Sequence, residues 1–126
     1  MEGKLRGVHH IALVTRNVEE SVSFYRDLLG FTEVERFFDE GEEADIVFLS
    51  LGNTLLELLT PRREEVLPPA SFHLAFAVEG VEEVFAELVA RGVPVVRALC
   101  ESHGFHYAYF RGPMGEIVEI VERKCS

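Results

Sequence analysis

The chain has 126 residues, 48% of them hydrophobic, which is enough for one domain with a core of its own. Its net charge of −10 and its shortage of Lys exclude the basic face of a nucleic-acid-binding protein. Short, interrupted apolar runs predict no membrane span, and the N-terminus lacks the apolar region of a secretion signal. We therefore expect a cytoplasmic protein whose two cysteines are reduced thiols. The absence of Gln and the scarcity of Asn point to a thermophilic source.

Residues 8–15 are apolar and β-branched and predict a strand that runs into Asn17. Asn17 is a favourable N-cap, with Glu20 at the capping-box position, and Gly30 is placed to end the helix. The apolar residues of this helix recur at helical spacing, at Val18, Val22, Tyr25 and Leu29. Further strands are predicted over 31–38, 45–51 and 54–60, the last two as a hairpin turning at Gly52 and Asn53.

Residues 61–70 contain three prolines and four charges and predict a linker. The order of elements then repeats. A strand is predicted over 72–78 and a helix over 81–91, which ends at Gly92. A strand at 94–99, a loop at 100–105 and strands at 106–111 and 116–122 follow. The helix residues expected to face inward are Val81, Val84, Phe85, Leu88 and Val89.

The two halves also repeat at the level of single residues. At a shift of 63, five of the eleven positions from 10 to 20 are identical, among them His10 with His73. The segment around Glu57 falls on that around Glu119 at a shift of 62, so one residue has been lost between these anchors. We expect an α+β fold of two βαβββ modules, about 7–60 and 71–122, within a single domain of residues 1–126.

The repeat places one His and one Glu in each half on an apolar strand. Because strand side chains alternate between faces, the apolar neighbours of Glu57 and Glu119 are expected to pack in a core while the carboxylates point to the other face. A buried charge without a partner is costly, so these carboxylates need a cation, a partner or water. Two His and two Glu suit Zn²⁺, Ni²⁺, Mn²⁺, Fe²⁺ or Co²⁺. Taken singly, a strand His is more often structural and a strand Glu solvent-facing. Their duplication favours a metal site at His10, Glu57, His73 and Glu119.

The sequence resembles the vicinal oxygen chelate superfamily, which comprises glyoxalases, bleomycin-resistance proteins and extradiol dioxygenases. The resemblance rests on His10-Ile-Ala-Leu, on the segment 19–31, on the opening of the second module at 72–78, and on Gly-Pro-Met-Gly-Glu-Ile-Val-Glu119. It implies paired βαβββ modules that form a cleft around one divalent metal, commonly in a homodimer. His10, Glu57, His73 and Glu119 each fall on a ligand position of the family.

Members with all four positions filled resemble glyoxalase I and methylmalonyl-CoA epimerase. The resemblance therefore implies a metal-dependent lyase or isomerase acting on a small molecule, with proton transfer through a metal-stabilised enediolate. Glu119 or Glu57 is the expected base, and analogy favours Glu119. Val14 stands where glyoxalase I usually has the arginine that holds glutathione, and Gly112-Pro113 replaces the usual Asp-Pro. Both departures weigh against glutathione as the substrate.

Three alternatives remain open. A methylmalonyl-CoA-type epimerase would usually carry a longer loop in the second module. An extradiol dioxygenase would use three protein ligands, which leaves Glu57 unexplained. A non-enzymatic drug-binding protein of the bleomycin-resistance kind would lack the ligands. Candidate substrate contacts outside the four ligand positions, each with an ordinary surface role as the alternative, are Arg16, Arg97, His103, His106, Tyr107 and Arg111.

Overall fold

A computed structural model of the chain describes residues 3–4, 8–40, 43–63, 73–102 and 104–124. The chain forms two compact units, residues 1–67 and 68–126, and each is described by itself. Most of the predicted linker, residues 64–70, lies outside the described residues. Within the described residues, no helix is long and apolar enough to cross a membrane.

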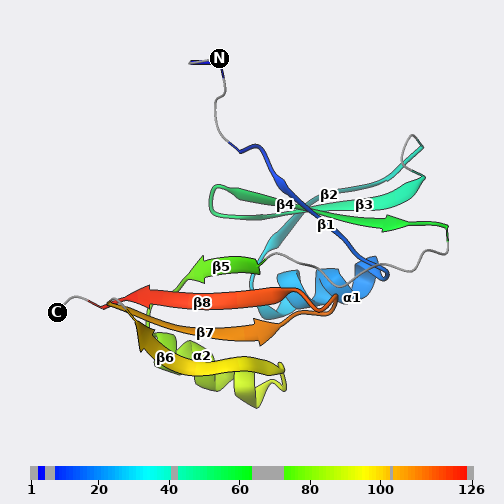
Figure 1. The fold of residues 1–126 in the computed structure, drawn as a ribbon. Coiled ribbons are helices and arrows are strands. Elements are labelled where there is room, and N and C mark those ends of the chain that lie inside the picture. Colours follow the sequence, from blue (N-terminus) through cyan, green and yellow to red (C-terminus); the bar gives the residue numbers. More distant parts are fainter. Residues whose placement is uncertain (1–2, 5–7, 41–42, 64–72, 103, 125–126) are drawn as a thin grey trace. The chain divides into compact units, whose positions relative to one another are not determined.

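The first unit is one sheet and one helical segment (Figure 1). The sheet has the order β1-β4-β3-β2, in which β1 runs parallel to β4 and the other neighbours are antiparallel. The helical segment begins as α-helix α1 and continues as π-helix η1. In chain order the elements are β1 (Ile11–Val14), α1 (Val18–Val22), η1 (Ser23–Leu28), β2 (Thr32–Asp39), β3 (Ala44–Leu51) and β4 (Thr54–Pro61).

The second unit repeats this topology (Figure 1). Its sheet has the order β5-β8-β7-β6, again with the first strand parallel to the last. The elements are β5 (His73–Ala77), α2 (Val81–Ala90), β6 (Val95–Ser102), β7 (Phe105–Arg111) and β8 (Ile117–Arg123). The predicted α+β fold with two βαβββ halves is therefore confirmed.

Each sheet buries one face and leaves the other partly open. In the first unit Leu13, Leu56 and Leu58 are buried and α1 contacts β3 and β4, so this face carries the core. In the second unit Val118 and Ile120 are buried in the same way, and α2 contacts β6, β7 and β8. The predicted alternation around the two glutamates is confirmed, because their strand neighbours fill the cores.

The two helical segments begin with different caps. The Asn17 side chain accepts a hydrogen bond of 3.1 Å from the backbone N–H of Glu20, which confirms the predicted cap. Helix α2 begins after Gly80, whose φ of 74° is in the left-handed region. Its first N–H groups, those of Gly80 and Val81, each donate a 3.0 Å bond to the carboxylate of Glu122 on β8. A residue 41 and 42 positions away in sequence thus caps the start of this helix.

The helical segment of the first unit was expected to be α-helical throughout, but its second part is a π-helix. The N–H of Leu29 donates to the carbonyl of Phe24, five residues back, at 3.1 Å. At the corresponding end of α2, Arg91 donates to Glu87, four residues back, at 3.0 Å. Tyr25, which lies in this wider turn, is completely buried. The helical spacing of apolar residues in the sequence does not by itself specify a π-helical turn.

Three other expectations were wrong. Strand β1 begins at Ile11 rather than at residue 8. Residues 100–105 are mostly strand, because bulges in β6 let it stay paired with β7 as far as Ser102. Val89, expected to face inward, is 46% exposed, since the apolar stripe of α2 is narrower than predicted.

Candidate functional site

In the first half, β1 and β4 bring His10 and Glu57 together. Glu57 lies opposite Ala12 across the parallel pair, and His10 immediately precedes β1. The His10 Nε2 atom is 3.6 Å from Glu57 Oε1. The side chain of Glu57 is 15% exposed and that of His10 is 36% exposed, so the pair is reached from the open face of the sheet.

The second half builds the same pair at the same register. Glu119 lies opposite Ala75, as Glu57 lies opposite Ala12, and His73 is the first residue of β5. The His73 Nε2 atom is 3.4 Å from Glu119 Oε1. The Glu119 side chain is again 15% exposed. The duplication seen in the sequence is thus reproduced in side-chain geometry, each half by itself.

The donor chemistry of each pair fits a divalent transition metal. Ligand atoms about 2.1 Å from one cation, at right angles or tetrahedral angles, stand about 3.0–3.4 Å apart, which is close to the measured separations. An imidazole nitrogen with a carboxylate oxygen suits Zn, Ni, Co, Mn or Fe. Across the described ranges, no three or more His, Cys, Asp or Glu side chains group at metal-binding distance, so each half supplies two donors.

An aromatic ring accompanies each pair, a feature that the sequence analysis missed. Phe48 lies opposite Glu57, and its ring centroid is 5.7 Å from that of His10. Tyr109 lies opposite Glu119, and its ring centroid is 6.1 Å from that of His73. The signal in the sequence would have been an aromatic residue at the matching position of the third strand of each half.

In a regular strand the side chains of His9 and His10 would point to opposite faces. Because β1 begins only at Ile11, the two rings instead meet edge to face, and their Nδ1 atoms are 3.0 Å apart. One of these atoms must carry the proton while the other accepts it. The Nε2 atom of His10 faces Glu57.

A pocket of about 350 Å³ opens beside Glu119 in the second half. Tyr107, one of the predicted substrate contacts, lies in its wall. Arg97, another, places its guanidinium 5.9 Å from the centre of the Tyr109 ring. The side chains that line the pocket are Ser102, Phe105, Tyr107, Tyr109, Glu119 and Val121.

The other predicted contacts are placed elsewhere. The His106 ring bonds Glu101 at 2.6 Å through Nε2 and approaches Glu82 at 3.5 Å through Nδ1, at the start of α2. Arg111 donates a 2.8 Å bond to the carbonyl of Gly115 within the last turn. Arg16 is exposed just after β1, and His103 lies outside the described residues. A role for these four in substrate binding stays a prediction.

Glu116 is a second feature that the sequence analysis missed. It is fully buried, and its carboxylate accepts a 2.7 Å bond from the N–H of Met114. A Cβ atom added at Gly112 would lie 2.5 Å from the carboxyl carbon of Glu116. Gly112, which replaces the Asp usual in the resembled family, thus leaves the space that this carboxylate occupies.

Residues 7–120 match the Glyoxalase/Bleomycin resistance protein/Dioxygenase superfamily. The chain belongs to this superfamily. It is 30% identical over 124 residues to Glyoxylase I 4 of Arabidopsis thaliana, covering 92% of this chain and 70% of that protein. A match to mouse mitochondrial methylmalonyl-CoA epimerase is 42% identical over 60 residues, covering 46% of this chain and 33% of that protein. The crystal structure of a glyoxalase family protein from Enterococcus faecalis superposes with a TM-score of 0.80 at 27% identity, covering 93% of this chain and 98% of that one.

Proposed function

We propose that this protein is a metal-dependent lyase or isomerase of the glyoxalase I type. In this proposal His10, Glu57, His73 and Glu119 together hold one divalent cation. The observation that carries it is the His–Glu pair repeated at one register in both halves, with separations of 3.6 and 3.4 Å. Membership of the superfamily supports the same ligand set.

A divalent cation bound there would polarise the two vicinal oxygens of a substrate and so acidify the C–H bond next to its carbonyl group. The residues of the chain would then move the proton. Glu119 is our candidate base, because its carboxylate lines the pocket in which a substrate would lie. Glu57 is the second candidate base.

A second candidate reaction is epimerisation of a methylmalonyl-CoA-type thioester. It is favoured by the 42% identity to the mouse epimerase over 60 residues. Both reactions remove a proton from a carbon beside a carbonyl, so the same carboxylates would serve. The two differ in the group attached to that carbonyl, which substrate assays separate.

The first test is the metal content of the full chain, purified without a His-rich tag. We expect close to one equivalent of Ni, Zn, Co, Mn or Fe, measured by elemental analysis. Glu57→Ala and His73→Ala remove one donor each from different halves, and both variants should lose most of the metal. Glu87→Ala removes an exposed carboxylate of α2 and is the matched control that should keep it. No metal, and no uptake on addition, would refute the proposal and leave a ligand-binding protein.

The second test is proton exchange. The metal-loaded protein should release the α-proton of hemithioacetals or of 2-methylmalonyl thioesters into solvent, followed by NMR in D₂O. Glu119→Gln should keep most of its metal and lose at least about a hundredfold in exchange rate, as expected for removal of a general base. Consumption of oxygen with a catechol substrate would instead assign the protein to the dioxygenases.

A further inference from the structure

The pocket beside Glu119 has a composition that identifies the kind of substrate it fits. Resting on the function proposed above, we infer that it selects substrates in which an aromatic ring joins the reacting 2-oxo or 2-hydroxyacyl group to a second anionic group. The ring would lie on Tyr107 and Tyr109, and the anion would reach Arg97.

The aromatic wall comes from the alternation of strand β7. Phe105, Tyr107 and Tyr109 occupy every second position and so share one face of the sheet. The rings of Tyr107 and Tyr109 are tilted by 42°, with centroids 5.5 Å apart, so they form one surface. Planar aromatic groups bind such surfaces by offset or edge contacts.

Strand β3 of the first half lacks this row of alternate aromatic residues. By strand pairing, Phe48 of β3 corresponds to Tyr109, since each lies opposite the glutamate of its half. Two and four residues earlier, the positions that correspond to Tyr107 and Phe105 hold Ile46 and Ala44, and both are buried. The row of aromatic residues on the third strand is therefore a property of the second half rather than of the repeated fold.

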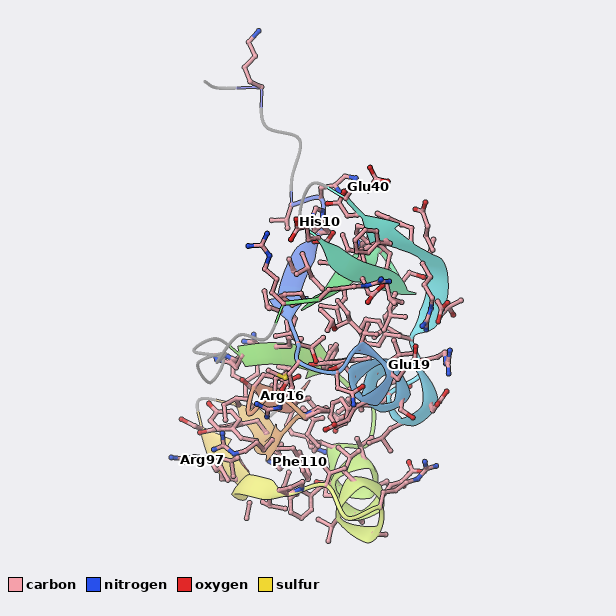
Figure 2. The ribbon with its side chains drawn as sticks, turned by 90° about the vertical axis from the view of Figure 1, so that its right-hand side faces the viewer. His10, Arg16, Glu19, Glu40, Arg97 and Phe110 are labelled. Atoms are coloured by element: carbon pink, nitrogen blue, oxygen red, sulfur yellow. The ribbon has the colours of Figure 1, made fainter. Side chains whose placement is uncertain are left out.

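Arg97 is placed for an anion at the far side of this wall. It lies opposite Tyr109 on β6, and Tyr109 lies opposite Glu119, so the three residues form one row across the sheet. Neighbouring strands are about 4.8 Å apart, which puts Arg97 about 10 Å from Glu119 at the backbone. Figure 2 shows Arg97 on β6 with its side chain extending to the side of the sheet away from α2. The position that matches it in the first half, opposite Phe48, holds an acidic residue, Glu35.

The charge of Arg97 is not used within its half. Among the described residues, no carboxylate lies within ion-pair distance of Arg97, although the chain carries 22 acidic residues. Arg62 offers the contrast, because it also covers an aromatic ring, that of Phe38, but is bound to Asp45 at 2.7 Å. A guanidinium over an aromatic ring with no carboxylate partner is suited to receive the anion of a ligand.

Cys100 lies opposite Tyr107 on the neighbouring strand. The Cys100 thiol beside the side chains of Tyr107 and Arg97 raises the pKa of each above its usual value. Tyr107 therefore stays a neutral phenol and Arg97 a cation at neutral pH. The volume of about 350 Å³ is near the lower end for small-molecule pockets, which suits one ring rather than a fused system.

Three probes separate the contributions of ring and anion: 4-carboxyphenylglyoxylate, phenylglyoxylate and cyclohexylglyoxylate. Their dissociation constants are measured by NMR titration of the full chain, as purified and after removal of metal with EDTA. We expect 4-carboxyphenylglyoxylate to bind about tenfold more tightly than phenylglyoxylate, the range of one hydrogen-bonded charge. Phenylglyoxylate should in turn bind several-fold more tightly than cyclohexylglyoxylate. This order in the wild type needs no variant to fold.

Two variants with matched controls assign the effect to residues. Arg97→Gln should remove the preference for the second carboxylate and leave phenylglyoxylate binding unchanged, while Arg62→Gln should leave both unchanged. Tyr107→Leu should reduce the preference for the aromatic ring, while Phe38→Leu should not. Amide spectra confirm that each variant is folded before titration.

Equal affinity for the three probes, or a carboxylate preference that survives Arg97→Gln, would overturn the inference. The metal-free titrations separate it from the proposed function. If ring and anion preferences appear without metal but no proton exchange occurs with it, the proposed reaction fails and the ligand class stands. If proton exchange occurs equally with the hemithioacetals of cyclohexylglyoxal and phenylglyoxal, which carry the α-proton that phenylglyoxylate lacks, the reaction stands and this inference fails.

Discussion

The two halves have the same strand order and the same His–Glu pair, yet their open faces differ. In the first half the rings of Phe37 and Phe48 stack at 6.2 Å, and Ile46 beside them is buried. In the second half the equivalent strand carries Tyr107 and Tyr109 on the wall of a pocket. The first face thus carries a stacked pair of phenylalanine rings, and the second carries two tyrosine rings that line a pocket.

The two halves thus share the His–Glu pair and differ in the side chains of the neighbouring strand. The pair depends on two strands that are hydrogen-bonded in parallel, so its register is set by the backbone. The wall depends on side chains of the neighbouring strand β7, which can be exchanged without moving the pair. In our two proposals, metal binding and ligand choice therefore depend on different strands of one sheet. Six substitutions test how far the two halves differ in the contacts that stabilise each one.

The largest effect is expected for Gly112→Ala in the last turn of the second half. Its added methyl would lie 2.5 Å from the buried carboxyl carbon of Glu116, so the turn must shift, at a cost of about 3 kcal/mol in unfolding free energy. The matched change in the first half, Gly52→Ala, meets no atom within 4 Å and costs only the strain of a φ of 57°, about 1 kcal/mol. Urea unfolding followed by amide signals of each half measures both. Equal losses would show that the Glu116 contact is not what requires glycine.

Glu122→Gln is expected to weaken the start of α2 in a pH-dependent way. Hydrogen bonds from the N–H groups of Val81 and Gly80 lower the pKa of Glu122 from its usual 4.5 to about 2. A carboxylate whose pKa is lowered on folding stabilises the folded state at pH values above its pKa in the unfolded chain. For Glu122 that stabilisation is lost as the pH falls from about 4.5 to 2. The difference in unfolding free energy between wild type and variant should shrink across this window. A constant difference would contradict the capping role.

Asn17→Ala tests the corresponding cap of the first half. It removes the hydrogen bond that the Glu20 N–H donates to the Asn17 side chain. Loss of such a cap typically lowers the unfolding free energy by about 1 kcal/mol. Because the amide does not titrate, this loss should be the same at pH 3 and pH 7. The measurement is the same urea titration, and a strong pH dependence would mean that the acidic first turn dominates instead.

The smallest effect is expected for Val89→Ala on α2. Val89 is 46% exposed, so its truncation should change the unfolding free energy by less than about 0.5 kcal/mol. Leu88→Ala, one residue earlier and 5% exposed, should cost about 2–4 kcal/mol. Similar losses of unfolding free energy at Val89 and Leu88 would show that the apolar stripe of α2 is as wide as the sequence predicted.

Alternation and repetition in the sequence were enough to predict the fold and both His–Glu pairs. The apolar neighbours of Glu57 and Glu119 specify which face each carboxylate takes, and the repeat specifies the partner. The pocket was not predictable, because bulges in β6 extend pairing through a segment with the composition of a loop. The burial of Glu116 and the cap from Glu122 were missed for a similar reason, since each depends on a contact that leaves no periodic signal.

The π-helix η1 accounts for a difference in length between the two halves. The segment from Val18 to Gly30 is one residue longer than the corresponding segment from Val81 to Gly92. This is the residue by which the shift of the repeat falls from 63 to 62. The bond from Phe31 to Tyr25 spans six residues, and its counterpart from Val93 to Leu88 spans five. The insertion or deletion that separates the two halves thus lies in the helical segment and leaves the register of the sheet unchanged. The helical segment therefore absorbs the difference in length, and the strand register that places each His–Glu pair is the same in both halves.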